Sequence, residues 1–185
     1  MDELLDKKHT DYRMKVRAFA EAEIKPVAVE LDEKEHFSVE LTRKMGKAGL
    51  FGITMPKELG GRGLDYLSYI IAVEEIARVD SSPAATIAAH NSLGLTPIYN
   101  FGTKAQQDAF IPQLCTGEKL WALGLTEISA GSDVKGVETT AKLIDQQWVI
   151  NGSKMFITNA ASEIAFGITN LAITGTIGDK NELSA

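Results

Sequence analysis

Glycine, serine and threonine crowd residues 124–136, directly after a short apolar run. Successive backbone N–H groups in such a loop can form a concave nest that binds an anion such as a phosphate. The hydroxyls of Thr126 and Ser132 add hydrogen-bonding groups for the polar edge of a cofactor. The residues by themselves leave two interpretations open: an anion- or cofactor-binding loop, and a plain turn capped by the side chain of Asp133.

Other chemical arrangements find little support. The histidines, His9, His36 and His90, are far apart and no cysteine pair accompanies them, so we expect no metal site. Cys115 has no partner at a catalytic spacing, and we expect a buried structural thiol. The glycines of residues 55–63 do not match the dinucleotide-binding fingerprint, and a turn between helices is the better interpretation.

Composition excludes several classes of protein. The 185 residues are 44% hydrophobic and 24% charged, which is enough for a packed core and unlike a disordered chain. A net charge of −6 offers no electrostatic footprint for nucleic acid. No apolar run of about 18 residues is present, so we expect no membrane span. The N-terminus lacks the features of a secretory signal, and the single cysteine suits a reducing compartment. Bacterial cytoplasm is the simplest location, and the mitochondrial matrix is the alternative.

The first part of the chain reads as helices. Helical spacing of apolar residues predicts a helix from Leu5 that Pro26 interrupts. A second helix should run from Ser38 to Gly49. A third should bury one face, made of Tyr66, Tyr69, Ile70, Val73, Ile76 and Ala77.

Two further helices are expected before residue 116. Ser82-Pro83 should open a helix with Ser82 as its N-cap, and its small residues Ala85, Ala88 and Ala89 suit either tight packing or a wall of an acyl-chain pocket. Thr103 and Gln106 form a capping box for a last helix, which Pro112 should end.

After Gly117 the pattern becomes strand-like. We expect strands over residues 121–125, 137–144 and 165–173. Asn151-Gly152 predicts a type I′ hairpin that joins residues 148–150 to 153–158, because both turn residues tolerate positive φ.

Several of these segments resemble motifs of the acyl-CoA dehydrogenase family. Residues 124–136 are similar to the family's first signature, and residues 151–160 resemble its second motif. Shorter matches lie at residues 56–61, 91–94 and 101–103, so that the resemblance covers about residues 2–160 in consistent order. Ile128-Ser129 departs from the family's usual Pro-Gly, although the loop keeps its length.

The resemblance implies an α+β protein. Residues 1–116 would form an all-α N-terminal helical domain, and residues 117–185 part of a middle β-barrel domain. The family's C-terminal four-helix domain would be absent, since family members are roughly twice as long as this chain. That domain carries the family's catalytic glutamate base, so the resemblance assigns no catalytic residue here and predicts that this chain alone is inactive.

The resemblance also implies function. FAD would be the cofactor, an acyl-CoA thioester the substrate and a trans-2-enoyl-CoA the product. The electron acceptor would be an electron-transfer flavoprotein, and the full-length form a homotetramer. The positions that match the family's cofactor contacts are Leu123, Leu125, Thr126, Ser132, Phe156, Ile157 and Thr158. Ser132 also matches a substrate contact, Phe156 an aromatic residue packed on the flavin, and Thr158 a donor near flavin N5.

The sequence leaves two other functions open. One is a non-catalytic binding or assembly module that keeps the fold. The other is a flavoenzyme of the same scaffold that uses oxygen, such as an acyl-CoA oxidase or a nitroalkane oxidase.

Overall fold

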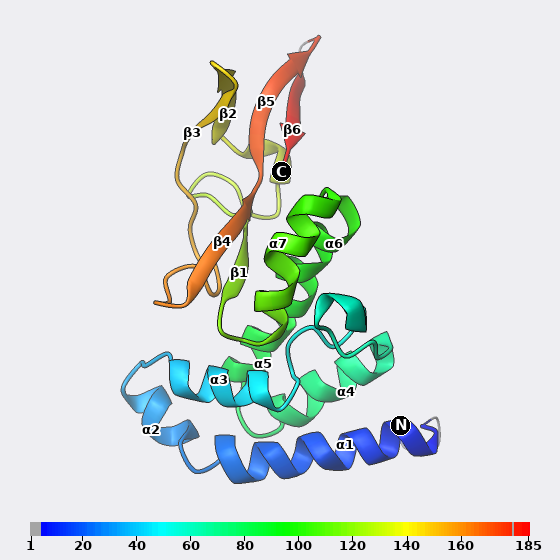
Figure 1. Cartoon of the computed structure of the whole chain (residues 1–185). Helices are drawn as coiled ribbons and strands as arrows, with labels where there is room; N and C mark the ends of the chain where they lie inside the picture. The colour runs from blue at the N-terminus through cyan, green and yellow to red at the C-terminus, as the bar shows by residue number, and fades with distance from the viewer. Residues whose placement is uncertain (1–4, 179) are drawn as a thin grey trace.

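The computed structural model describes residues 5–178 and 180–185, with helices before residue 116 and strands after residue 119 (Figure 1). The helices are α1 (Lys7–Phe19), α2 (Ala28–Glu33), α3 (Val39–Lys47), α4 (Tyr66–Ala77), α5 (Ser81–Ala89), α6 (Thr96–Phe101) and α7 (Lys104–Cys115). Turns of π-helix follow α1 at Ala20–Ile24 and α5 at His90–Leu95. A short 3₁₀ turn, Lys57–Leu59, lies in the loop between α3 and α4, as the glycine pattern predicted.

Side chains at the helix ends confirm two of the predicted starts. The hydroxyl of Ser38 accepts from the backbone N–H of Leu41 at 3.1 Å and begins α3. Gly49 follows that helix with a φ of +77°, a conformation that glycine adopts without steric cost. Thr103 and Gln106 form the complete capping box of α7.

Two predictions about helix ends were wrong. α5 begins at Ser81, because the carboxylate of Asp80 accepts from the N–H of Ser82 at 2.8 Å, and Ser82 is not the N-cap. Pro112 does not end α7, which continues to Cys115. Burial of Ile111, Leu114 and Cys115 on both sides of the proline offsets the backbone hydrogen bond that it cannot donate.

The buried face of α4 matches the prediction only in part: Ile76 is buried as expected, but the face also contains Ser68, Ile71, Ala72 and Glu75. Tyr66 and Ile70 are 66% and 53% exposed, whereas Glu75 is 2% exposed. Glu75 accepts two hydrogen bonds from Arg17 of α1, at 2.7 and 2.8 Å. These bonds lower the pKa of Glu75 despite its burial. Apolar periodicity could not find the whole face, because a buried carboxylate that is paired with the half-exposed Arg17 helps to select it.

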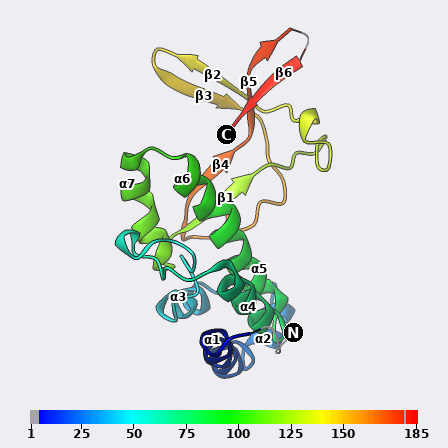
Figure 2. The same ribbon diagram turned by 90° about the vertical axis from the view of Figure 1, so that its right-hand side faces the viewer.

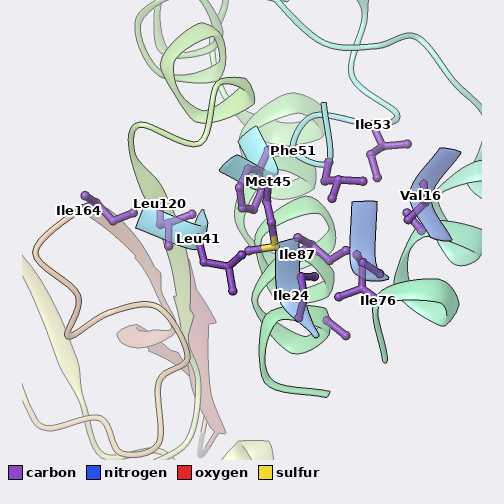
Figure 3. Close-up of a cluster of buried hydrophobic side chains, with 14 residues drawn as sticks. Val16, Ile24, Leu41, Met45, Phe51, Ile53, Ile76, Ile87, Leu120 and Ile164 are labelled. Carbon is purple, nitrogen blue, oxygen red and sulfur yellow. The ribbon is translucent and has the colours of Figure 1, made fainter. Parts of the chain in front are cut away.

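One hydrophobic cluster joins the helices to the first strand. Helices α1, α3 and α5 contribute to it, for example through Val16, Met45 and Ile87. Figure 3 shows Leu120 and Ile164 side by side at the edge of this cluster. The N–H of Leu120 donates to the carbonyl of Ile164 at 2.9 Å. The start of the strand region is therefore anchored in the helical core.

The strands form two sheets. β1 (Leu120–Gly124) pairs in parallel with β4 (Ala165–Asn170). The second sheet has the order β3-β2-β5-β6, made of β2 (Thr140–Ile144), β3 (Gln147–Asn151), β5 (Ala172–Ile177) and β6 (Lys180–Ser184). The described strands do not close into a barrel (Figure 2), and the α+β fold class with an incomplete barrel is confirmed.

The predicted hairpin turn was wrong. β2 and β3 are joined at Asp145-Gln146, whose φ values of 48° and 65° suit a type I′ turn. Asn151 pairs with Thr140 at the end of β3, and residues 153–158 form no strand. The pairing of β2 with β3 over five residue pairs places the turn at Asp145-Gln146. This pairing outweighs the local preference of Asn151-Gly152 for a turn.

The other strand predictions differ in their bounds. β2 begins at Thr140, three residues later than expected, because the preceding residues bind the side chain of Glu127. The expected strand over residues 165–173 is two strands, β4 and β5, which belong to different sheets. Among the described residues, no helix combines the length and the apolar character that crossing a membrane requires.

Candidate functional site

The loop that follows β1 projects on the side of the strand region opposite α7 (Figure 2). Glu127 and Ala130 exchange backbone hydrogen bonds of 2.8 and 3.3 Å and close its first turn. Asp133 caps the 3₁₀ turn Val134–Gly136 by accepting from the N–H of Lys135 at 3.2 Å. The capped turn suggested by the sequence is thus present, and residues 125–132 lie outside it.

The two sequence motifs meet at Thr126. The carbonyl of Thr126 accepts from the N–H of Met155 at 2.8 Å. This bond sets the segment 156–158 beside the end of β1. Farther along, the side chain of Asn159 donates to the carbonyl of Thr86 in α5 at 3.4 Å. The second motif therefore contacts both the end of β1 and helix α5.

A buried ion pair fastens the same two segments. Nζ of Lys154 lies 2.7 Å from Oε1 of Glu127 and donates to the carbonyl of Leu125 at 3.1 Å. The two side chains are only 9% and 5% exposed. Glu127 also accepts from the N–H groups of Glu138 and Thr139, at 2.6 and 3.1 Å.

The electrostatics of Glu127 follow from these partners. Burial favours the neutral carboxyl and raises its pKa. Lys154 and the two backbone N–H groups favour the carboxylate and bring the pKa of Glu127 down to about 2. The carboxylate is therefore ionised and fully engaged at neutral pH.

The predicted cofactor residues lie at the end of β1, on the following loop and on residues 156–158. Leu123, Leu125, Thr126 and Ile157 are half-buried, and Ser132 and Thr158 are exposed. Phe156 is 86% exposed. The backbone contacts bring Thr126 and the segment 156–158 together, whereas Ser132 stands farther along the loop without a described contact to them.

Phe156 has an unusual backbone. Its φ is +58°, a left-handed conformation that is strained for a bulky side chain. Strain of this kind persists only where the surroundings hold it, and it is concentrated at functional sites. The exposed ring of Phe156 thus resembles a contact surface and not a core side chain.

Several hydrogen-bonding groups of the predicted cofactor residues and of the neighbouring loop are unused. Within residues 5–178 and 180–185, the hydroxyls of Thr126, Ser132 and Thr158 have no partner, and neither have the amides of Gly131 and Ser132. A Cβ added at Gly131 would meet no atom within 4 Å, so the loop is open there. Unpartnered hydroxyls at Thr126 and Thr158 in the segments joined by the Met155–Thr126 bond, together with the open amides at Gly131 and Ser132, fit a planar, polar cofactor that carries phosphate groups.

Glu127 and Lys154 were missed as site residues. Both stand inside the motifs that carry the resemblance, but neither was given a role. Their charge is the only signal in the sequence, and charged residues are usually exposed. Their contact across 27 residues is decided by the tertiary structure.

Other groups with chemical potential lie away from this site. A cleft of about 700 Å³ between α6, α7 and the strands is lined by Phe110, Trp121 and Trp148, and none of the predicted cofactor residues lines it. Cys115 is a buried thiol, as predicted, and burial raises its pKa to about 12. Among the described residues, no group of three His, Cys, Asp or Glu side chains is placed to hold a metal ion.

The helical part of the chain and its strand region each match a known family of domains. Residues 6–118 match the family model for the acyl-CoA dehydrogenase N-terminal domain, and residues 122–182 match that for the middle domain. The chain belongs to the acyl-CoA dehydrogenase family.

Individual relatives agree with this. A short-chain specific acyl-CoA dehydrogenase of Clostridium acetobutylicum is 45% identical over 168 residues, which are 91% of this chain and 44% of the relative. A glutaryl-CoA dehydrogenase of Mycobacterium smegmatis in complex with FADH2 superposes with a TM-score of 0.89 at 30% identity, over 100% of this chain and 47% of the other. A structure described as the electron transferring flavoprotein of Acidaminococcus fermentans superposes with a TM-score of 0.86 at 39% identity, over 96% and 46% of the two chains. The chain spans less than half the length of these proteins.

Proposed function

We propose that this chain forms one face of the flavin site of an FAD-dependent acyl-CoA dehydrogenase that converts an acyl-CoA thioester to a trans-2-enoyl-CoA. The observation that carries the proposal is the exposed ring of Phe156 in a segment that the Met155–Thr126 bond holds beside the end of β1, with unpartnered hydroxyls at Thr126 and Thr158. FAD, when bound, supplies the acceptor for the hydride that leaves the β-carbon of the substrate.

Each residue has a proposed task. Thr126 and Thr158 donate hydrogen bonds to the polar edge of the flavin, where fixed donors stabilise the charge of the reduced ring. The amides of Gly131 and Ser132 would bind the phosphates of the cofactor, and Ser132 would also contact the acyl-CoA. Phe156 packs on the ring system and excludes water, and Leu123, Leu125 and Ile157 supply the rest of the contact surface.

The exposed side of α5 suits the acyl chain. Ala85 is exposed and Ala88 and Ala89 are half-exposed, so these small side chains are not used up in tight packing. Asn159 ties the second motif to this helix at Thr86. A wall of small residues beside the flavin segment leaves room for a thin acyl chain.

We propose that no residue of this chain is the catalytic base. A base must accept the α-proton of the substrate, and a carboxylate with a pKa near 2 that is buried in an ion pair, as in Glu127, is poorly suited to this. We therefore expect the isolated chain not to turn over substrate. We also propose that the boundary between the helical domain and the β domain lies between residues 116 and 117.

The assembled enzyme has further proposed partners. An electron-transfer flavoprotein would accept the electrons, and the full-length form would be a homotetramer. The family resemblance supports both. We propose a bacterial cytoplasmic location, with the mitochondrial matrix as the alternative, since relatives include a bacterial protein and a human protein named as mitochondrial.

A titration tests the proposal. The purified 185-residue chain is titrated with FAD while flavin fluorescence and absorbance are followed, and butyryl-CoA is then added without oxygen. We expect saturable binding of FAD and no bleaching of the flavin band. Bleaching would contradict the predicted inactivity, and rapid reoxidation by oxygen would then favour the oxidase. A folded chain that does not bind FAD would favour the non-catalytic module.

A further inference from the structure

The Glu127–Lys154 pair joins three separate stretches of backbone. Through Lys154 it holds the carbonyl of Leu125 at 3.1 Å, at the end of β1. Through Glu127 it holds the N–H groups of Glu138 and Thr139 before β2. Lys154 itself stands three residues after β3 ends and two residues before Phe156. The pair is therefore a crosslink between the end of β1 and the paired ends of β2 and β3, which belong to the other sheet.

The neighbourhood of Phe156 needs such a crosslink. The left-handed φ of +58° at Phe156 costs energy, and exposed side chains cannot compensate it by packing. The segment 153–158 forms no strand or helix, and Met155 contributes a single backbone bond, to Thr126 at 2.8 Å. Lys154 supplies the additional contacts that keep this segment beside β1.

Burial makes the crosslink dependent on both partners. An ion pair that is more than nine-tenths buried leaves an uncompensated charge when either partner is removed. Exposed pairs such as Lys34–Glu30 on α2, whose side chains are 65% and 63% exposed, carry no such penalty. The exposed pair is thus a matched control.

We propose that Glu127 and Lys154 are positioning residues that hold the two flavin-contacting segments, 123–126 and 156–158, at one fixed separation. The inference rests on the proposed function, because it assigns the pair to the same site. Neither residue needs to touch the cofactor: Lys154 acts through the carbonyl of Leu125 and through the backbone that carries Phe156.

The test compares Lys154→Met, Lys154→Arg and Lys34→Met in the full 185-residue chain. Methionine keeps the length of the side chain but removes the charge, whereas arginine keeps the charge and can still donate to Glu127 and Leu125. FAD affinity, the shape of the bound flavin absorption band and amide hydrogen exchange at Glu138, Thr139 and Met155 are measured, together with the midpoint of thermal unfolding.

We expect Lys154→Met to weaken FAD binding at least tenfold, which corresponds to about 1.4 kcal/mol. It should also broaden the absorption band of the bound flavin and accelerate hydrogen exchange at the amides of Glu138, Thr139 and Met155. Lys154→Arg should recover most of the affinity, and Lys34→Met should behave as wild type. A role limited to general stability would lower the melting midpoint without changing the flavin band of the folded fraction, and that result overturns the inference.

The two proposals fail in different ways. If the wild-type chain binds FAD and Lys154→Met binds it equally well, the positioning role is wrong and the proposed function stands. If the wild-type chain binds no FAD, the proposed function is contradicted for this chain. Hydrogen exchange then tests by itself whether the Glu127–Lys154 pair holds these segments together. Unchanged exchange at Glu138, Thr139 and Met155 in Lys154→Met would overturn the inference. Faster exchange at these amides that Lys154→Arg reverses would support it.

Discussion

Nδ1 of His90 accepts a hydrogen bond from the backbone N–H of Trp121 at 3.1 Å. Nε2 of the same ring lies 2.9 Å from the carbonyl of Leu114 and donates to it. One neutral imidazole therefore connects the end of α7 to the start of β1, the strand that leads into the candidate site. Because the ring is fully buried, its pKa falls to about 4.

The first prediction concerns pH. The unfolded chain binds a proton at this histidine below pH 6.5, whereas the folded chain does so only near pH 4. The free energy of unfolding should thus fall as the pH drops from 6.5 to 4, by up to about 3 kcal/mol from this group. Above pH 6.5 the contribution of His90 should be constant.

Urea denaturation at several pH values measures this effect. Carboxylates titrate in the lower part of the range, so the difference between the wild type and His90→Gln isolates the histidine. Parallel stability curves for the two proteins between pH 4 and 6.5 would show that His90 does not carry the effect.

The second prediction concerns Glu127→Gln. The change keeps the shape of the side chain but leaves the ammonium of Lys154 buried beside a neutral amide. We expect the free energy of unfolding to fall by about 3 kcal/mol, as for other broken buried pairs. Glu30→Gln at the exposed pair should change it by less than about 1 kcal/mol. Equal effects of the two substitutions, measured in urea, would contradict the burial argument.

The third prediction concerns Gly167 in β4. A Cβ at this position would come within 2.3 Å of the ring of Trp121. Gly167→Ala should therefore displace the ring, break the 2.9 Å bond from its Nε1 to Thr169 and cost roughly 1–3 kcal/mol. Gly131→Ala meets open space and should leave the thermal midpoint unchanged. Tryptophan fluorescence reports the displacement, and an unaltered spectrum with wild-type stability would refute it.

The fourth prediction separates stability from binding at Phe156. Glycine adopts the left-handed conformation freely, and the exposed ring gives up little burial, so Phe156→Gly should raise the free energy of unfolding by up to about 1 kcal/mol. The same change should weaken FAD binding, because the ring packs on the flavin in our proposal. Phe101→Gly, which removes an equally exposed ring, should leave FAD binding intact. A loss of stability in Phe156→Gly would show that the ring is structural.

Local sequence signals predicted features that depend on local contacts. The capping box of Thr103 and Gln106 and the Ser38 cap join groups three residues apart, so their chemistry is visible in the sequence. The helical character before residue 116 and the strand character after residue 119 follow from the spacing of apolar residues. The motif residues from Leu123 to Thr158 indicated the family and the candidate site by their types and order.

Long-range contacts decided the rest. Asp145-Gln146 displaced Asn151-Gly152 as the hairpin turn, because the pairing of β2 with β3 sets the register over five residue pairs. Glu75 lies on the otherwise uncharged buried face of α4, because α1 brings Arg17 to it.

The sequence by itself determined the family, the change from helices to strands near residue 117 and which residues are candidates for the flavin site. Only the tertiary structure decided that Glu127 and Lys154 meet and that Phe156 is held exposed in a left-handed conformation. The physical reason is that a charge is stable in the interior only beside its partner, and that partner stands 27 residues away in the chain.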